Sequence, residues 1–154
     1  MMYPNIRCYI CGGKVSFGDK YVNCLDCGYI LSDLEDEKDF HIEPEDVKEK
    51  LDDTDVIVLD VREPLENQTS KLPNSILIPL GQVSNRYSEL DKNKKIVVYC
   101  HHGLRSFHAT RFLIQKGFNA KNIYGGIHNY SNLDPSIPKY NAIFTGTKLI
   151  VRKL

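Results

Sequence analysis

From residue 40 onward, short runs of β-branched and apolar residues alternate with segments of helical spacing. The run from Asp55 to Asp60 has a continuous apolar centre, which is typical of a parallel strand buried on both faces. Strands are also expected at 75–79, 95–99 and 122–124, and helices at 44–51, 83–90 and 106–116. This alternation predicts an α/β fold, a doubly wound parallel sheet with helices on both faces.

One cysteine stands where such a sheet binds its ligands. Cys100 follows the strand-like residues 95–99 and precedes a turn and a helix start near Gly103. Open α/β sheets bind ligands beyond the carboxyl ends of their strands. Backbone N–H groups of the turn and a nearby Arg105 favour negative charge on the sulfur. The pattern predicts a nucleophilic cysteine, and a small buried hydrophobic residue is the alternative.

The other four cysteines form two Cys-x-x-Cys pairs, Cys8 with Cys11 and Cys24 with Cys27. Twelve residues separate the pairs, and a glycine follows each pair. The two-residue spacer lets both sulfurs face one ion, and glycine tolerates the left-handed backbone that closes the turn. The arrangement resembles a zinc ribbon over residues 1–32, with a hairpin at 14–22. A closed four-thiolate site implies a structural or docking role, with folding that depends on the metal.

Other chemistries stay open for these four thiols. Iron can replace zinc in a four-thiolate site, so zinc is the expected cofactor and iron its alternative. Two further alternatives are a pair of disulfides and a redox-active pair of cysteines. Disulfides are typical of secreted proteins, and a redox pair is typical of a single motif in a βαβ setting. Tyr9, Tyr21 and Tyr29 are expected to form the small core of the ribbon.

Charge is unevenly distributed along a chain whose formal net charge is zero. Residues 33–53 hold eleven acidic residues against three lysines, a net charge of −8, whereas residues 54–154 carry +7. We interpret 33–42 as an acidic linker and the basic remainder as a domain that prefers small anions. A solvated surface is the simpler alternative. Dense basic patches with interleaved aromatic residues are absent from the sequence, so nucleic acid is not favoured as a partner.

The sequence gives no indication of a membrane segment. Its apolar runs are all shorter than the roughly 18–20 residues of a membrane span. The start, Met1–Asn5, lacks the basic and apolar regions of a signal peptide. We therefore expect a cytoplasmic protein that does not associate with membranes.

Several motifs occur in the order of one known family. They are Asp60-Val61-Arg62-Glu63-Pro64 with Glu66, Ile78-Pro79-Leu80, Val97-Val98-Tyr99-Cys100, Gly103-Leu104-Arg105-Ser106 and Gly125-Gly126-Ile127. With these motifs, residues 40–134 resemble a single-domain rhodanese. The expected organisation is a rhodanese-like domain at 43–134 and a C-terminal extension at 135–154. The resemblance implies a sulfurtransferase whose cysteine takes sulfur from a donor as a persulfide and passes it to a nucleophile.

The resemblance also implies roles for individual residues. Cys100 would be the sulfur-carrying nucleophile, and its loop would cradle the persulfide. Arg105 would help to hold an anionic donor such as thiosulfate, and Asp60 and Arg62 would brace the pocket. A protein persulfide is the alternative donor, and the ribbon offers a docking surface for a protein acceptor. The residues implied in substrate binding are His101, His102, Gly103, Leu104, Arg105, Ser106, Asp60 and Arg62.

The sequence departs from the family pattern at a few positions. His101 stands where the family often has arginine, so a partly protonated group replaces a fixed charge. Modest or pH-dependent activity on thiosulfate is expected. Residues 70–75 and Tyr130 also differ from the family, and these differences look structural. The loop from Cys100 to Arg105 is one residue shorter than the Cys-x5-Arg loop of tyrosine phosphatases, which favours sulfur over phosphate chemistry.

Three further expectations concern parts of the chain outside these motifs. His41, His108 and His128 are expected to be ordinary surface or half-buried residues, and the side chains of His101 and His102 are expected to diverge. The strand-like residues 148–152 are expected to pair with the ribbon or the sheet edge, or to fray. The alternative function is a catalytically silent rhodanese-like module that docks a partner through its zinc ribbon.

Overall fold

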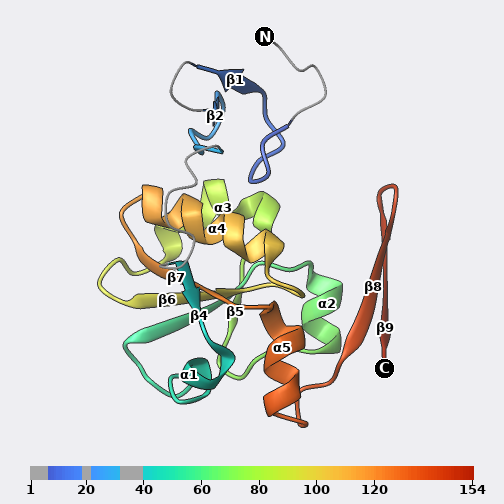
Figure 1. Ribbon diagram of the computed structural model, residues 1–154. Coiled ribbons are helices and arrows are strands. Elements are labelled where there is room, and N and C mark those ends of the chain that lie inside the picture. The colour runs from blue at the N-terminus through green and yellow to red at the C-terminus, as the bar shows by residue number, and fades with distance from the viewer. Residues whose placement is uncertain (1–6, 19–21, 32–39) are drawn as a thin grey trace.

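The computed structural model describes residues 7–18, 22–31 and 40–154, so Tyr21 and most of the expected acidic linker lie outside the described residues. The centre is a five-stranded sheet in the order β3-β7-β6-β4-β5, and every pairing in it is parallel. The strands are β3 (His41–Ile42), β4 (Val56–Asp60), β5 (Ile76–Leu77), β6 (Lys95–Tyr99) and β7 (Asn119–Ile123) (Figure 1).

The two central strands, β4 and β6, are buried on both faces. Val58 pairs with Val97 and Leu59 with Val98, and each of the four is at most 3% exposed. Successive residues of a strand point to opposite faces. Val58 and Val97 therefore join one hydrophobic cluster, and Leu59 and Val98 join the other. Burial of both faces explains why these runs are continuously apolar.

Helices cover both faces of the sheet (Figure 1). Phe112 of α4 (Leu104–Gln115) joins the cluster of Leu59. Val47 of α1 (Pro44–Lys48) and Ile127 of α5 (Gly126–Leu133) join the cluster of Val58. The predicted α/β fold with helices on both faces is confirmed. The helices are α1 (Pro44–Lys48), α2 (Pro64–Thr69), α3 (Leu80–Arg86), the 3-10 helix η2 (Tyr87–Glu89), α4 (Leu104–Gln115) and α5 (Gly126–Leu133).

Some elements differ from the predictions. α3 begins at Leu80, three residues earlier than predicted, and its N-cap residue is Pro79, with a φ of −53°. β7 begins at Asn119, where polar residues conceal the strand pattern. The sequence pattern did not predict β3 or α5. Two consecutive glycines, Gly125–Gly126, are typical of a turn, and their φ values are +73° and +68°. In the structure α5 nevertheless starts at Gly126.

The N-terminal hairpin lies next to α3 and α4 (Figure 1). It consists of the antiparallel strands β1 (Val15–Phe17) and β2 (Val22–Cys24). β1 lies within the predicted hairpin at 14–22, and β2 extends two residues beyond it. Tyr29 is fully buried and shares a hydrophobic cluster with Phe112 of α4, whereas Tyr9 is 58% exposed. The expectation that Tyr9 belongs to the small core of the ribbon is therefore wrong, whereas Tyr29 is buried in a core that the ribbon shares with the larger domain.

The C-terminal residues form a hairpin of their own. Its strands are β8 (Tyr140–Thr145) and β9 (Lys148–Lys153), which pair antiparallel and run beside α2 (Figure 1). Thr145 lies opposite Lys148, so Gly146, with a φ of +60°, opens a two-residue turn. The expectations for residues 148–152 are wrong, because the chain supplies a partner strand in β8.

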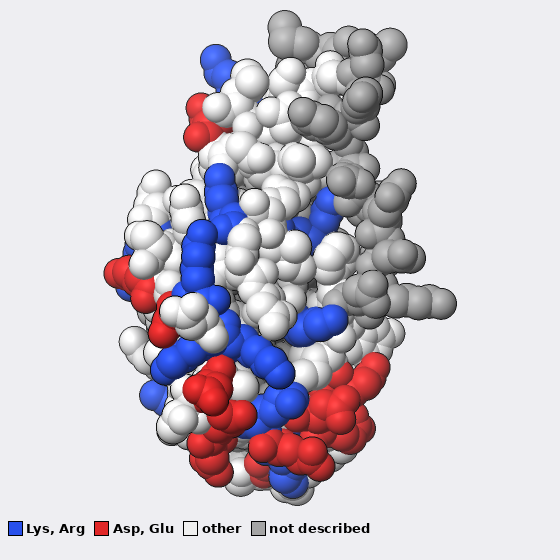
Figure 2. Space-filling model, turned by 90° about the vertical axis from the view of Figure 1, so that its left-hand side faces the viewer, with Lys and Arg blue, Asp and Glu red and all other residues white. Residues whose placement is uncertain are grey.

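Acidic side chains gather at one end of the molecule. Figure 2 shows them at the lower end, where Figure 1 places α1, and the first turn of α1 carries Glu45 and Asp46. Basic side chains lie between this end and the ribbon (Figure 2). Within the described ranges, none of the helices has the length and apolar character needed to cross a membrane.

Candidate functional site

The sulfur of Cys100 accepts hydrogen bonds at the carboxyl end of β6. The backbone N–H of Gly103 donates to Sγ at 3.1 Å, and the hydroxyl of Ser106 donates at 3.2 Å. Gly103 has a φ of +106°, a conformation that glycine adopts without steric cost, and the loop turns back toward the sulfur there. Two donors directed at one sulfur stabilise negative charge on it. The site can therefore support a nucleophilic thiolate.

A cavity of about 460 Å³ adjoins Cys100. Part of its lining comes from the loop after β6 and the start of α4, and the rest comes from β8. No local motif in residues 140–145 indicates this role, which depends on the tertiary fold. The lining residues are Cys100, His101, His102, Leu104, Arg105, Asn141, Ala142 and Phe144.

Arg105 is paired with a buried carboxylate. Its Nη1 and Nη2 donate to Oε2 and Oε1 of Glu66, both at 2.8 Å, and the Glu66 side chain is 0% exposed. Burial alone would raise the pKa of Glu66, but the hydrogen bonds and charge of Arg105 outweigh burial and lower it. The charge of Arg105, which is expected to hold an anionic donor, is thus balanced by Glu66.

Tyr140 links this pair to a second buried ion pair. Its hydroxyl donates to Oε1 of Glu66 at 3.0 Å and accepts from Nη1 of Arg62 at 2.9 Å. Burial raises the pKa of Tyr140, so the hydroxyl keeps its proton at neutral pH. Arg62 also donates from Nε and Nη2 to the two carboxylate oxygens of Asp60, at 2.9 Å and 2.7 Å. One hydroxyl therefore connects two ion pairs.

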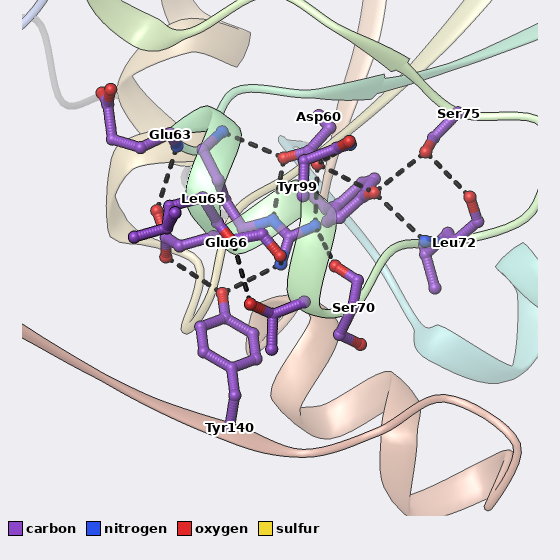
Figure 3. A network of polar contacts seen from close by, with 12 residues as sticks. Asp60, Glu63, Leu65, Glu66, Ser70, Leu72, Ser75, Tyr99 and Tyr140 are labelled. Atoms are coloured by element: carbon purple, nitrogen blue, oxygen red, sulfur yellow. Dashed lines mark hydrogen bonds and ion pairs between the residues drawn. The ribbon is translucent and has the colours of Figure 1, made fainter. Parts of the chain in front are cut away.

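Asp60 belongs to the polar network of Figure 3, and Arg62 is hydrogen-bonded to it. Both are 0% exposed, and neither lines the cavity. Nη2 of Arg62 also donates to the carbonyl of Ser70 at 2.6 Å, and the Tyr99 hydroxyl donates to Oδ2 of Asp60 at 3.2 Å. Their connection to the cavity runs through Tyr140, at the start of β8. This geometry is suited to positioning other residues and not to direct contact with a ligand in the cavity.

His101 lies against the first residue of β8. Its ring stacks on Tyr140 with a centroid distance of 4.0 Å and an interplanar angle of 14°, and the residue is 8% exposed. Burial, and then the neighbouring His102, lower the pKa of His101 to about 4. The expectation of a partly protonated group is wrong, because His101 is neutral at pH 7. Arg105 is therefore the one permanently charged residue among those that line the cavity.

The four N-terminal cysteines form a tight cluster. Their sulfurs lie within 4.8 Å of one another, with 3.7 Å between Cys8 and Cys27 and 3.5 Å between Cys11 and Cys24. Zinc–sulfur bonds of about 2.3 Å in a tetrahedron place the sulfurs about 3.8 Å apart. Backbone N–H groups approach three of the sulfurs at 3.4 Å. These four residues could hold a metal ion.

The ribbon contacts α4 through Tyr29 and His108. The Tyr29 hydroxyl and Nδ1 of His108 are 2.8 Å apart, and the ring of Tyr9 stacks on His108 with a centroid distance of 4.3 Å. The N–H of Ile30 donates to Oε1 of Gln115 at 3.0 Å, and Nε2 of Gln115 donates to the Ile30 carbonyl at 3.2 Å. His108, which is expected to be an ordinary surface or half-buried residue, is half-buried and joins the ribbon to the larger domain.

If the four sulfurs hold a metal ion, its removal by a chelator is expected to unfold the ribbon before the sheet. The ribbon has two three-residue strands, so a metal–thiolate cage would supply most of its folding free energy. Amide hydrogen exchange measures this order. The N–H of Cys24, bonded to the Tyr29 carbonyl at 2.8 Å, should lose protection while that of Val98 in β6 keeps it. Unchanged protection at Cys24 after complete metal removal would contradict the prediction.

Acidification is expected to destabilise the contact between the ribbon and α4. Burial, and then the charge of Arg111, lower the pKa of His108 to about 4, against 6.5 for an ordinary histidine. Between these values the unfolded chain binds a proton that the folded chain excludes, so stability falls as the pH drops from 6.5 to 4. Between pH 7 and pH 5 the Tm of His108→Gln should therefore fall less than that of wild type. The Tm of the control His41→Gln should fall by as much as that of wild type. Equal losses in His108→Gln and wild type would rule this linkage out.

Comparisons with known proteins place this chain among rhodanese-like proteins. The Rhodanese-like domain family matches residues 43–133. A sulfurtransferase from Allochromatium vinosum is 35% identical over 88 residues, 56% of this chain and 82% of that protein. A tRNA uridine(34) hydroxylase from Cytophaga hutchinsonii is 35% identical over 96 residues, 58% of this chain but 31% of that protein. A crystal structure of a rhodanese-related protein from Thermoplasma volcanium has a TM-score of 0.58 and 36% identity, covering 61% of this chain and 92% of that one.

The matched region holds the Cys100 loop and the Asp60–Arg62 pair, and it excludes the four clustered cysteines and β8. It makes up more than half of the 154-residue chain. The fold described above, with its loop after β6, agrees with this match. The chain therefore belongs to the rhodanese-like domain family.

Proposed function

We propose that this chain is a rhodanese-type sulfurtransferase in which Cys100 carries sulfane sulfur as a persulfide. The main support is that the Gly103 N–H and the Ser106 hydroxyl both donate hydrogen bonds to Sγ of Cys100, beside a cavity. Such donors stabilise the thiolate before transfer, and the same loop is suited to hold a persulfide anion afterwards. The sulfurtransferase relative from Allochromatium vinosum supports this class of reaction.

The proposed reaction has two transfers and needs no external oxidant. The Cys100 thiolate attacks the outer sulfur of the donor, a sulfur–sulfur bond forms, and the remainder of the donor leaves with the bonding electron pair. With thiosulfate, the leaving group is sulfite. An acceptor such as cyanide or a thiolate then attacks the outer sulfur of the persulfide, and the Cys100 thiolate is released. Covalent catalysis of this kind divides one transfer into two easier steps.

The residues around Cys100 take different roles in this proposal. Substrate is held by the loop and helix start, with Asn141, Ala142 and Phe144 of β8 on the other side of the cavity. Asp60 and Arg62 act through Tyr140, which they hold in place. The substrate-contacting residues proposed on the loop side are His101, His102, Gly103, Leu104, Arg105 and Ser106.

The charge balance of the cavity favours a protein persulfide over thiosulfate as the donor. His101 is neutral at pH 7, and Arg105 is neutralised by Glu66. A doubly charged donor such as thiosulfate therefore meets little uncompensated positive charge, whereas a protein donor can bind through a wider surface. Thiosulfate remains a convenient assay substrate.

The ribbon, residues 1–32, is proposed to hold zinc in a structural site and to dock a protein partner, with iron as the alternative metal. The four sulfurs fit a tetrahedral site with no open coordination position, which excludes the ribbon metal from the transfer step. The proposed organisation continues with an acidic linker at 33–42, a catalytic domain at 43–134 and an extension at 135–154. A silent rhodanese-like module that docks a partner is the competing function.

Initial-rate kinetics test the proposed two-step transfer. With thiosulfate and cyanide varied together, ping-pong kinetics should give parallel lines in double-reciprocal plots, because the donor remnant leaves before the acceptor reacts. Intersecting lines would indicate a ternary complex and contradict a free persulfide intermediate. Absence of turnover with every sulfane donor and acceptor would favour the silent binding module.

A further inference from the structure

Three of the five histidines of the chain converge on the Cys100 loop. The ring centroids of His101 and His102 are 3.9 Å apart, and those of His102 and His128 are 4.9 Å apart. One ring nitrogen of each lies within 4.8 Å of the other two. The expectation that the side chains of His101 and His102 diverge is wrong, because these residues lie in a turn and not in a strand.

The backbone holds His128 against the loop. The N–H of His128 donates to the carbonyl of His101 at 3.1 Å, and the N–H of Ile127 donates to the carbonyl of Cys100 at 2.9 Å. A Cβ atom on Gly126 would lie 2.4 Å from the His101 carbonyl oxygen, so glycine permits this close approach. The first turn of α5 is thereby fixed over the loop, and the three rings are brought together before any ligand binds.

One of these rings has an unsatisfied polar atom. Nε2 of His101 is buried and lacks a hydrogen-bond partner within the part of the chain that the structure describes. The residue as a whole is 8% exposed. Buried polar atoms are nearly always partnered, and an exception in a native fold points to a ligand, a water or an ion. A ring that carries a buried, unpartnered nitrogen beside two other imidazoles is a suitable metal ligand.

We propose that His101, His102 and His128 bind a divalent transition-metal ion such as Zn²⁺ beside the cavity of Cys100. Imidazole nitrogens suit zinc, copper and nickel. Three protein ligands leave a fourth coordination position open, unlike the closed cysteine cluster of the ribbon. Zinc–nitrogen bonds of about 2.0–2.1 Å require nitrogens about 3.3–3.4 Å apart. Small rotations of the exposed His102 and half-buried His128 can close the observed spacing.

The site adds a property to the proposed sulfurtransferase and does not depend on it. His101 and His102 line the same cavity as Cys100, so a bound cation would supply positive charge where Arg105 is already neutralised. An anionic donor or the thiolate itself would experience that charge. Zinc binding is measured separately from sulfur transfer, so failure of either proposal leaves the other intact.

Zinc titration of the full chain, with the ribbon cysteines already holding their metal, tests the proposal. Calorimetry should detect one further Zn²⁺ per chain. His102→Ala and His128→Ala should each weaken this binding at least about tenfold, since even the loss of outer-shell partners costs about 10–100-fold. The matched control His41→Ala should bind as the wild type does. Cys100→Ser should also retain the ion, since the three histidines form the site.

Histidine ring signals in NMR identify the ligands directly. As Zn²⁺ is added, the ring signals of His101, His102 and His128 should shift together, and those of His41 and His108 should not. The proposal is overturned if no further ion binds or if the His102 and His128 variants bind Zn²⁺ as tightly as wild type. Loss of binding in Cys100→Ser, or unshifted signals of the three histidines, would overturn it equally.

Discussion

Cys100→Ser is expected to reduce kcat/KM for sulfur transfer by about 10⁴-fold or more, the scale seen when a catalytic nucleophile is removed. A serine hydroxyl stays protonated at neutral pH and cannot form a persulfide. The Gly103 N–H and Ser106 hydroxyl that now contact the sulfur cannot compensate, because they stabilise charge but do not carry sulfur. Steady-state assays with a sulfane donor and cyanide measure the effect.

The fold should survive this substitution. Serine is slightly smaller than cysteine, and its oxygen can still accept the N–H of Gly103. Thermal unfolding of the variant should therefore stay close to wild type, which separates loss of chemistry from loss of structure. Retained transfer in a correctly folded Cys100→Ser protein would contradict the assignment of the nucleophile.

Arg62→Leu is expected to destabilise the protein by about 3–5 kcal/mol, the range for breaking a buried ion pair by removing one partner. The guanidinium is 0% exposed and donates to Asp60, to the Ser70 carbonyl and to the Tyr140 hydroxyl. Leucine would leave the Asp60 carboxylate buried without its counter-charge. Urea unfolding of the variant measures the loss.

A matched surface substitution provides the control for this effect. Arg86 pairs with Glu89 at 2.9 Å, but the two side chains are 39% and 54% exposed. Arg86→Leu should therefore lower the free energy of unfolding by less than about 1 kcal/mol. The double variant Asp60→Asn with Arg62→Leu should lose less stability than the sum of the single losses, because no uncompensated charge remains. A loss below about 1 kcal/mol in Arg62→Leu would show that the network in Figure 3 is not structurally important.

Local patterns were sufficient to predict the centre of the fold and the position of Cys100. The continuous apolar runs became β4 and β6 because both faces of these strands are buried. The turn after β6 followed from the order strand, glycine, helix, which is contained in a short stretch of sequence. Such features depend on neighbouring residues, so they can be recognised without tertiary information.

The rest of the site depends on contacts between distant residues. Tyr140 lies 74 positions from Glu66 and 78 from Arg62, yet its hydroxyl joins both. Glu66 occurs within a recognised motif, but its bond to Arg105 spans 39 positions and changes the charge of the cavity. The low pKa of His101 likewise arises from burial beneath Tyr140. No spacing rule predicts these effects, because they arise only when segments far apart in the sequence pack together.

The most direct test of Cys100 as the sulfur carrier is the intact mass of the protein before and after incubation with a sulfane donor. Wild type and Cys100→Ser should be treated in parallel with thiosulfate and with a persulfide-bearing cysteine desulfurase. Wild type should gain one sulfur atom with at least the protein donor, cyanide should remove it, and Cys100→Ser should gain none. No gain with either donor, or an equal gain on Cys100→Ser, would contradict a persulfide on Cys100.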